Sequence, residues 1–367
     1  MCTKILAKDK ANNIISMRTM EAAIDLEYEI AIIPRNYECN FTNNENIIDL
    51  GTYKTKYAVM GARDFLGLYG SKSSFHEAMN EAGLSIGANA FRNVCRFPIK
   101  DPADFKEGDF DGEEILNYII SNFKTVDEVR NFIDEYQGRI FMDTRLQYNT
   151  THIAVSDATG ATIVIEPIDG IFEIVDNPMN VITNAPTQQA HFANLSNYMH
   201  LSPYEATNSL NFQNETGGDY TNMSSGTGAN GLPGNNYSMS RFIRGCFFQR
   251  TIVLDDNQEN SMRAMWSVAN NFDIPLGSSR EKVNPVHKTT AGSKYWLWSD
   301  MDNDEVVDLS VFTMVQDQTN GIIQYKDWKN NSIREVNMHD YDLAGSKIIS
   351  VQVYADGSEA VQKVELT

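Results

Sequence analysis

The chain opens with Met1-Cys-Thr-Lys-Ile-Leu-Ala-Lys-Asp-Lys-Ala-Asn-Asn-Ile-Ile-Ser-Met-Arg-Thr-Met-Glu21. Residues 3–7 and 14–20 are β-prone runs, and residues 9–13 between them have the residue types of a turn. We therefore predict an antiparallel hairpin at the N-terminus. Pairing of its two strands would return Arg18 close to Cys2.

A cysteine directly after the initiator methionine suggests a nucleophile. Methionine aminopeptidase removes Met1 before a small second residue, which leaves Cys2 with a free α-amine. The reference pKa is about 7.7 to 8 for such an amine and about 8.5 for a thiol, so base and nucleophile would reside in one residue. The alternative is that Cys2 is a small buried hydrophobic residue, as free cysteines usually are.

Four polar residues are candidates for the rest of such a site. The Arg18 guanidinium would favour a Cys2 thiolate, and the Glu21 carboxylate would hold or orient the protonated amine. Asn184, at the end of a predicted strand, has a side-chain amide that can donate to a developing oxyanion. Arg241 is a charge just before apolar residues. Taken singly, each has a structural interpretation: a surface pair for Arg18 and Glu21, a turn residue for Asn184 and a helix-surface charge for Arg241.

Hydrophobic spacing predicts the remaining elements. We expect a strand over residues 29–34, a helix over 74–82, two helices over 113–136 with a break near Lys124, short strands over 152–183, a helix over 259–271 and strands from Ser310 onward. Residues 203–237 are rich in Asn, Ser and Gly and predict a long polar loop. Strands and helices do not alternate strictly, so the pattern favours an α+β fold of antiparallel sheets packed against helices, in a single domain over residues 1–367.

The composition excludes several classes of partner. The 367 residues have a formal net charge of −19, which repels phosphate backbones and argues against nucleic acid. No apolar run approaches the roughly 20 residues of a membrane-spanning helix, and the charged N-terminus does not resemble a secretory signal. Four scattered cysteines predict free thiols in a reducing, cytoplasmic compartment.

Two motifs suggest other chemistry but lack its context. Gly226-Thr-Gly-Ala-Asn-Gly231 matches a dinucleotide fingerprint, yet a polar stretch precedes it and Pro233 follows it instead of a helix. Asp300-Met-Asp-Asn-Asp304 begins like a calcium loop but lacks its glycine and final glutamate. The histidines show no metal-ligand spacing. We expect no cofactor and no catalytic metal.

A series of short motifs, taken in order, resembles the choloylglycine hydrolase family, which contains conjugated bile acid hydrolases and penicillin V acylases. The matching stretches include Arg18-Thr-Met-Glu21, Met79-Asn-Glu-Ala-Gly-Leu84, Thr183-Asn-Ala-Pro186 and Ser240-Arg-Phe-Ile-Arg244. The resemblance implies an αββα sandwich of the N-terminal-nucleophile (Ntn) hydrolases, with Cys2 as nucleophile. It also implies active-site roles for Arg18, Glu21, Asn184 and Arg241, and assembly as a homotetramer.

The chain departs from the family pattern at three places. Glu21 stands where the family usually has Asp, one methylene shorter. The loop that contributes a backbone N–H to the oxyanion hole has Tyr in penicillin V acylases and Asn in bile acid hydrolases, whereas the register here points to Ala90, with Asn89 beside it. Extended loops lie near residues 205–237 and 278–306, and in them the extra residues around 213–225 and 278–306 have no clear counterpart in the family.

The resemblance leaves the substrate open. Arg18-Thr-Met favours the penicillin V acylases, and Ser238-Met-Ser-Arg-Phe242 favours the bile acid enzymes. N-acyl homoserine lactones are a third candidate for the small-molecule amide. The altered carboxylate and loop also fit a different class, a ligand-binding member of the fold without catalysis.

Overall fold

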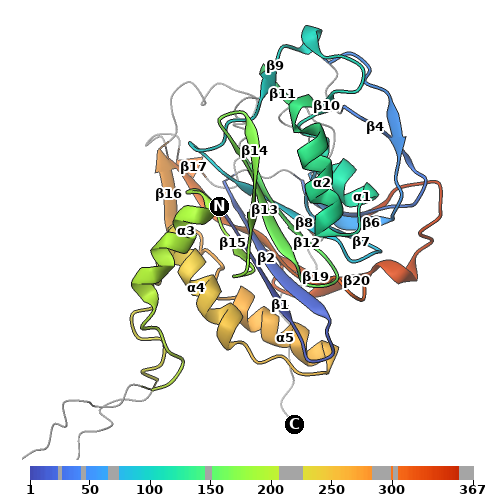
Figure 1. Ribbon diagram of the computed structural model, residues 1–367. Coiled ribbons are helices and arrows are strands. Elements are labelled where there is room, and N and C mark those ends of the chain that lie inside the picture. Colours follow the sequence, from blue (N-terminus) through green and yellow to red (C-terminus); the bar gives the residue numbers. More distant parts are fainter. Residues whose placement is uncertain are drawn as a thin grey trace, which may run out of the picture.

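Two antiparallel sheets form the centre of the computed structural model, which describes residues 1–23, 27–42, 47–64, 74–144, 151–205, 226–282, 299–300 and 305–354 (Figure 1). The first sheet runs in the order β15 (Val181–Ile182), β1 (Cys2–Lys8), β2 (Ile14–Ala22), β18 (Glu305–Asp317), β19 (Ile322–Asp327) and β20 (Arg334–Asn337). Two short strands, β16 (Ser279–Lys282) and β17 (Ser299–Asp300), also pair with β18.

The second sheet runs in the order β14 (Ile171–Asp176), β13 (Thr162–Ile168), β12 (Thr151–Ser156), β8 (Ser85–Ala90), β7 (Phe75–Asn80), β6 (Val59–Arg63), β3 (Glu29–Ile33) and β21 (Ile349–Gln352). The remaining strands are short and lie outside the two large sheets: β4 (Glu38–Asn40), β5 (Thr52–Lys54), β9 (Ile99–Lys100), β10 (Phe110–Asp111) and β11 (Ile140–Asp143).

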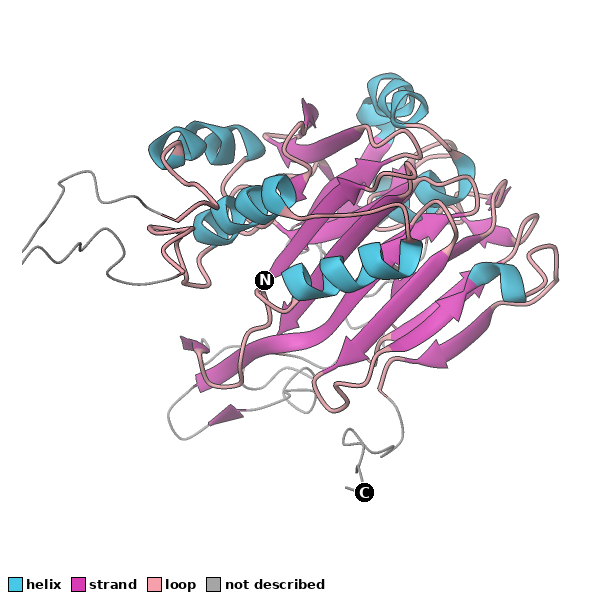
Figure 2. Cartoon of the chain, turned by 90° about the horizontal axis from the view of Figure 1, so that it is seen from below, coloured by secondary structure: helices cyan, strands magenta, loops and turns pink. Residues whose placement is uncertain are grey.

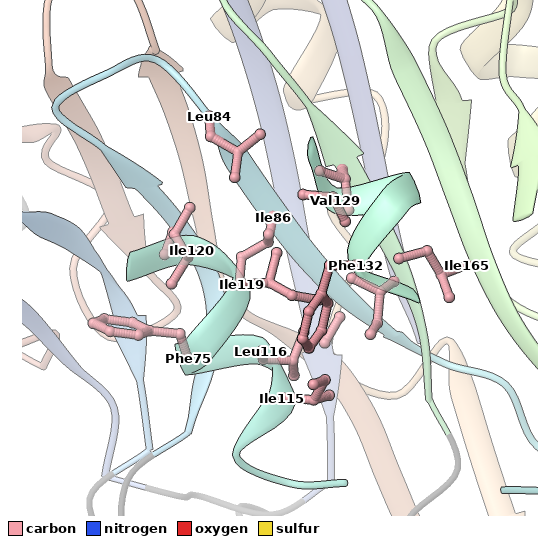
Figure 3. Packing of buried hydrophobic residues seen from close by; sticks show 14 of the residues in the cluster. Phe75, Leu84, Ile86, Ile115, Leu116, Ile119, Ile120, Val129, Phe132 and Ile165 are labelled. Carbon is pink, nitrogen blue, oxygen red and sulfur yellow. The ribbon is translucent and has the colours of Figure 1, made fainter. Parts of the chain in front are cut away.

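Helices cover the outer face of each sheet (Figure 2). α1 (Ile115–Asn122) and α2 (Val126–Tyr136) pack on the second sheet through a buried apolar cluster, in which Ile119 and Phe132 lie close to Ile86 (Figure 3). α4 (Ser238–Thr251) and α5 (Gln258–Ala269) pack on the first sheet, with α3 (Gln188–Leu195) beside α4. The predicted αββα arrangement is therefore confirmed.

The space between the sheets is filled by a second buried cluster. Met20 and Met314 reach it from the first sheet, and Met60 and Met79 reach it from the second. Because side chains alternate along a strand, Cys2 on β1 also points into this space. The candidate nucleophile thus lies between the two sheets.

The helix expected over residues 74–82 is wrong, because β7 occupies Phe75–Asn80. The residues Phe-His-Glu-Ala-Met-Asn include good helix formers and no β-branched residue, so local propensity favoured a helix. Backbone pairing with both β6 and β8 overrides that propensity. Because a helix was expected here, nothing in the sequence indicated that Glu77 is a charged residue in the middle of a central strand.

The other predicted elements agree with the structure to within a few residues. The N-terminal hairpin is β1 and β2, the two helices break at Phe123–Thr125, and residues 152–183 contain strands β12 to β15. Part of the extended loop expected over 278–306 forms β16 and β17 instead. Residues 206–225, 283–298, 301–304 and 355–367 are outside the described ranges, and with them most of the calcium-like motif and the extra residues near 213–225.

Candidate active site

The hairpin of β1 and β2 places Cys2 beside Arg18. The strand register pairs Cys2 with Met20 and Lys4 with Arg18, so all four side chains face the space between the sheets. The Arg18 Nη2 atom lies 3.4 Å from the Cys2 Sγ atom, and the Met20 Sδ atom lies 3.5 Å from the same sulfur. The sulfur therefore has a cation on one side and a thioether on the other.

The guanidinium of Arg18 is fully buried and is held by contacts from the second sheet. Its Nη1 atom donates to Glu77 Oε2 at 3.2 Å and to Asn89 Oδ1 at 3.0 Å, and its Nη2 atom donates to the Ala88 carbonyl at 2.7 Å. Burial lowers the pKa of Arg18, but the charges of Cys2, Glu77 and Glu21 outweigh it and raise the pKa above its usual value. Arg18 is thus a permanent cation next to the sulfur.

Asn184 follows the short strand β15 and contacts Cys2 from the opposite side. Its Oδ1 atom accepts from the Cys2 backbone N at 2.9 Å and from Arg241 Nη2 at 2.6 Å. Its Nδ2 atom donates to the carbonyl of Ala90 at 2.8 Å. The amide has a second N–H, which is the group that an oxyanion next to Cys2 would need.

Arg241 lies in the first turn of α4 and is buried, so it is not a helix-surface charge. Its Nη1 atom donates to the Cys2 carbonyl and, at 2.7 Å, to Thr3 Oγ1. Its Nε atom donates to the Asn236 carbonyl at 2.9 Å. Arg241 therefore fixes the backbone of Cys2 from the helix side, while Arg18 approaches the sulfur.

Glu21 lies next to the chain terminus on β2. With Met1 present, the terminal N atom donates to the Glu21 backbone carbonyl at 2.6 Å, and Glu21 N donates to the Met1 carbonyl at 2.8 Å. The carboxylate accepts from Ser310 Oγ at 3.3 Å through Oε1, and its buried Oε2 has no hydrogen-bond partner among the described residues. Burial raises the pKa of Glu21, although the terminal amine and Arg241 partly offset that effect.

Asn89 and Ala90 end strand β8 rather than lying in a loop. The side chain of Asn89 is fully buried between Arg18 and the Thr183 carbonyl, to which Nδ2 donates at 2.7 Å. These two contacts hold Asn89 between Arg18 and the Thr183 backbone. Ala90 reaches the site through its backbone, where Asn184 binds its carbonyl.

Two buried histidines, which the sequence did not single out, support the Thr183–Asn184 backbone. His191 Nε2 lies 2.8 Å from the Asn184 carbonyl, and His152 Nε2 lies 3.2 Å from the Thr183 carbonyl. Burial lowers the pKa of His191 to about 4, so its imidazole is neutral near pH 7 and can donate to the carbonyl. Ser238 Oγ also contacts this backbone, 2.9 Å from the Asn184 carbonyl oxygen.

Lys4 and Glu77 were also missed. Lys4 is two residues after Cys2 on one face of β1, and its Nζ atom pairs with the Glu77 carboxylate. The available signal was a lysine inside the strand, at the spacing that puts it on the face of Cys2. Glu77 had no comparable signal, because its segment resembled a helix.

The chemistry of the site follows from these contacts. The site combines three groups: a thiol beside a buried guanidinium, an amide N–H, and a backbone nitrogen that becomes an amine when Met1 is removed. Together they suit nucleophilic attack on a carbonyl. Within the described ranges, no group of three His, Cys, Asp or Glu side chains could hold a metal ion. No helix in the described part of the chain is long and apolar enough to cross a bilayer.

Comparisons with known proteins agree with this chemistry. A family model described as linear amide C–N hydrolases, choloylglycine hydrolase family, matches residues 2–351. The chain is 27% identical over 360 residues to a bile salt hydrolase/transferase of Clostridium perfringens (strain 13 / Type A), which covers 95% of each chain. It is 22% identical over 308 residues to a penicillin V acylase of Pectobacterium atrosepticum, which covers 78% of this chain and 73% of that protein. A crystal structure of a mutant conjugated bile acid hydrolase from Clostridium perfringens matches with a TM-score of 0.78 at 25% identity and covers 100% of both chains.

Proposed function

The chain belongs to the choloylglycine hydrolase family of linear amide C–N hydrolases, and on this basis we propose that Cys2, freed by removal of Met1, is the nucleophile that cleaves the amide. The observation that carries the proposal is the 3.4 Å contact between Arg18 Nη2 and Cys2 Sγ in a buried site. A fixed cation next to a thiol favours the thiolate, which is the reactive form.

The proposed base is the α-amine of Cys2. The Cys2 nitrogen already contacts Asn184 Oδ1, so removal of Met1 exposes an amine with an acceptor in place. The buried Oε2 of Glu21, which has no hydrogen-bond partner among the described residues, lies close to the same terminus and can accept from the amine. Both groups favour an amine that can take up and return a proton.

The reaction proceeds in two stages. The thiolate forms a bond to the carbonyl carbon, the carbonyl electron pair moves to oxygen, and the N–H of Asn184 together with a backbone N–H near Ala90 stabilises the oxyanion. Collapse breaks the C–N bond as the α-ammonium of Cys2 gives its proton to the leaving nitrogen. Water, deprotonated by the amine, then attacks the thioester and releases the acid and the free thiol.

We propose conjugated bile acids as the first substrates, in which an apolar acyl group is linked to a small amine-bearing partner. The bile salt hydrolase/transferase relative matches over nearly its whole length. Penicillin V is the second candidate, because a penicillin V acylase also matches over most of its length. Both compounds join an apolar acyl group to nitrogen through a linear amide.

A hydrolysis panel tests the function. Processed protein, with Met1 loss verified by intact mass, is incubated with glyco- and tauro-conjugated bile acids, penicillin V and an N-acyl homoserine lactone. We expect amine release from at least one conjugate, little activity in Cys2→Ser and none in Cys2→Ala. The matched control is a version with untrimmable residues ahead of Met1, which keeps Cys2 in a peptide bond. Wild-type rates in Cys2→Ala or in the blocked protein would exclude the proposed mechanism.

A further inference from the structure

Beneath Cys2, Arg18 lies in a buried cluster with Lys4 and Glu77, two residues to which the proposed reaction assigns no role. Lys4 Nζ pairs with Glu77 Oε1, and Arg18 Nη1 pairs with Glu77 Oε2 at 3.2 Å. The three side chains are at most 4% exposed. With Lys4 and Arg18 both protonated, one carboxylate between two cations leaves the cluster with one unbalanced positive charge. Burial lowers the pKa of Lys4, and the contact with Glu77 partly offsets that effect.

The surrounding chain is shaped to hold this cluster. Gln316 on β18 donates to Glu77 Oε1 at 3.1 Å, and Lys4 donates to Ser85 Oγ at 2.9 Å. At Gly87, a Cβ atom would lie 2.6 Å from Glu77 Oε2 and 3.2 Å from Arg18 Nη1. Glycine at this position on β8 therefore leaves room for the ion pair, and both sheets contribute to it.

We propose that Lys4 and Glu77 are positioning residues for the nucleophile. Glu77 holds one edge of the Arg18 guanidinium so that Nη2 faces Cys2 Sγ, and Lys4 supplies the charge that keeps the cluster positive. The Cys2 thiolate then neutralises the cluster, which favours that form in an interior where charges are weakly screened. The inference rests on Cys2 as the nucleophile of the proposed function.

The charge supplied by Lys4 and the hydrogen bond supplied by Glu77 can be tested separately. When Lys4 is removed, the remaining pair of Arg18 and Glu77 is neutral. The thiolate then loses the unbalanced charge that attracts it. Without both Lys4 and the charge of Glu77, Arg18 alone restores one positive charge, and a glutamine at position 77 can still accept from Arg18. Net charge and hydrogen bonding can therefore be changed independently.

Alkylation of Cys2 by iodoacetamide, followed across pH by mass spectrometry of its peptide, measures the thiolate directly. The charged groups near the sulfur are the Cys2 amine, Arg18, Glu21 and Arg241, and all are unchanged in the variants. Burial raises the pKa of Cys39, Cys95 and Cys246 to about 12, so these thiols serve as internal references.

We expect Lys4→Met to move the midpoint of the alkylation profile upward by roughly one pH unit, with a correspondingly slower reaction at pH 7. Lys4→Met with Glu77→Gln should return the midpoint to near that of the wild type. Lys8→Met, which removes an exposed lysine from the same strand, is the matched control. If Lys4→Met loses its near-ultraviolet circular dichroism, Lys4→Gln takes its place.

A Lys4→Met profile that overlays that of Lys8→Met would overturn the inference, as would a double variant that stays shifted with the single one. Because the readout needs no substrate, the two proposals fail separately. If the Lys4→Met alkylation profile is shifted but the protein hydrolyses no amide, only the proposed function is contradicted. If hydrolysis depends on Cys2 but the Lys4→Met alkylation profile is unshifted, only this inference is contradicted.

Discussion

Asn184 shows how one residue can combine two functions at a site. Its Oδ1 atom accepts from the Cys2 nitrogen and from Arg241, while its Nδ2 atom donates to the Ala90 carbonyl. In the proposed mechanism, the acceptor organises the terminus before reaction, and the donor acts when negative charge develops. These functions can be separated, because an aspartate keeps the acceptor and loses the donor.

We expect Asn184→Ala to lower kcat more than it raises KM, by on the order of 10²–10³-fold, the usual effect of deleting an oxyanion donor. Asn184→Asp should be at least as harmful, because it places a carboxylate where negative charge develops. Steady-state kinetics on a hydrolysed conjugate measures both. An active Asn184→Asp beside an inactive Ala variant would assign Asn184 a structural role only.

At the scale of elements, helix α4 determines where Arg241 lies. Gly245, one turn after Arg241, lets α4 approach the first sheet closely: a Cβ there would meet Val181 Cγ1 at 2.6 Å and Ile5 Cδ1 at 3.4 Å. The small residue therefore sets the distance between helix and sheet, and with it the reach of Arg241 to Cys2. In the same way, strand β7 determines where Glu77 lies.

Gly245→Ala should destabilise the protein and lower kcat, because the added methyl pushes α4 away from β15. Overpacking typically costs about 1–3 kcal/mol, of which better helix propensity returns up to about 1 kcal/mol. Adding Val181→Ala should recover much of both losses, so a double-mutant cycle in urea should show coupling. Gly138→Ala, at an exposed glycine with no atom within 4 Å of its Cβ position, is the control. Additive effects would contradict this account.

Helix α3 carries the buried His191, which makes the stability of the protein depend on pH. The folded pKa is about 4, while the unfolded chain takes up the proton near the ordinary value of about 6.5. The contribution of His191 to stability is therefore complete above pH 6.5 and is lost as the pH falls toward 4.

By pH 5 the loss from His191 should be about 2 kcal/mol of the free energy of unfolding. His191→Gln, which can still donate to the Asn184 carbonyl, should lose correspondingly less between pH 7 and pH 5. Urea denaturation at both pH values measures the difference, with His200→Gln at an exposed position as control. An equal decline in the wild type and His191→Gln would contradict a contribution of His191 to the pH dependence.

At the scale of the whole molecule, the site exists only where the two sheets and the α4 layer meet. Cys2 and Arg18 come from the first sheet, Glu77 and Asn89 from the second, and Arg241 from the helix layer. Large apolar side chains are exposed in the segment after α3 and directly before α4, among them Met199, Tyr204 and Tyr237. A homotetramer, which the family resemblance implies, would bury such side chains if they lay at its subunit contacts.

We predict that the chain forms a homotetramer. Light scattering coupled to size exclusion should give a mass four times that of one chain. Met199→Asp with Tyr204→Asp should lower that mass if these residues lie at an interface, because burying a carboxylate is costly. A monomer in the wild type would contradict the prediction, and an unchanged tetramer in the variant would place the interface elsewhere.

Local patterns in the sequence were sufficient for much of the fold. The hairpin of β1 and β2, the two helices α1 and α2 and the strands after residue 152 follow from periodicity and turn chemistry, which act over a few residues. The resemblance of short motifs to a known family supplied Cys2, Arg18, Glu21, Asn184 and Arg241 as candidates and the αββα arrangement. The distances between these side chains could not be predicted from the resemblance.

Tertiary structure alone decided that residues 75–80 form strand β7, that Lys4 and Glu77 are buried, and which groups Asn89 contacts. A strand at the centre of a sheet is stabilised by pairing on both sides, which outweighs the helix propensity of Glu, Ala and Met. A buried charge is stable only with its partner, and here the partners are 73 residues apart in the case of Lys4 and Glu77. Sequence spacing carries no record of such a contact, because it forms only when the two sheets stack.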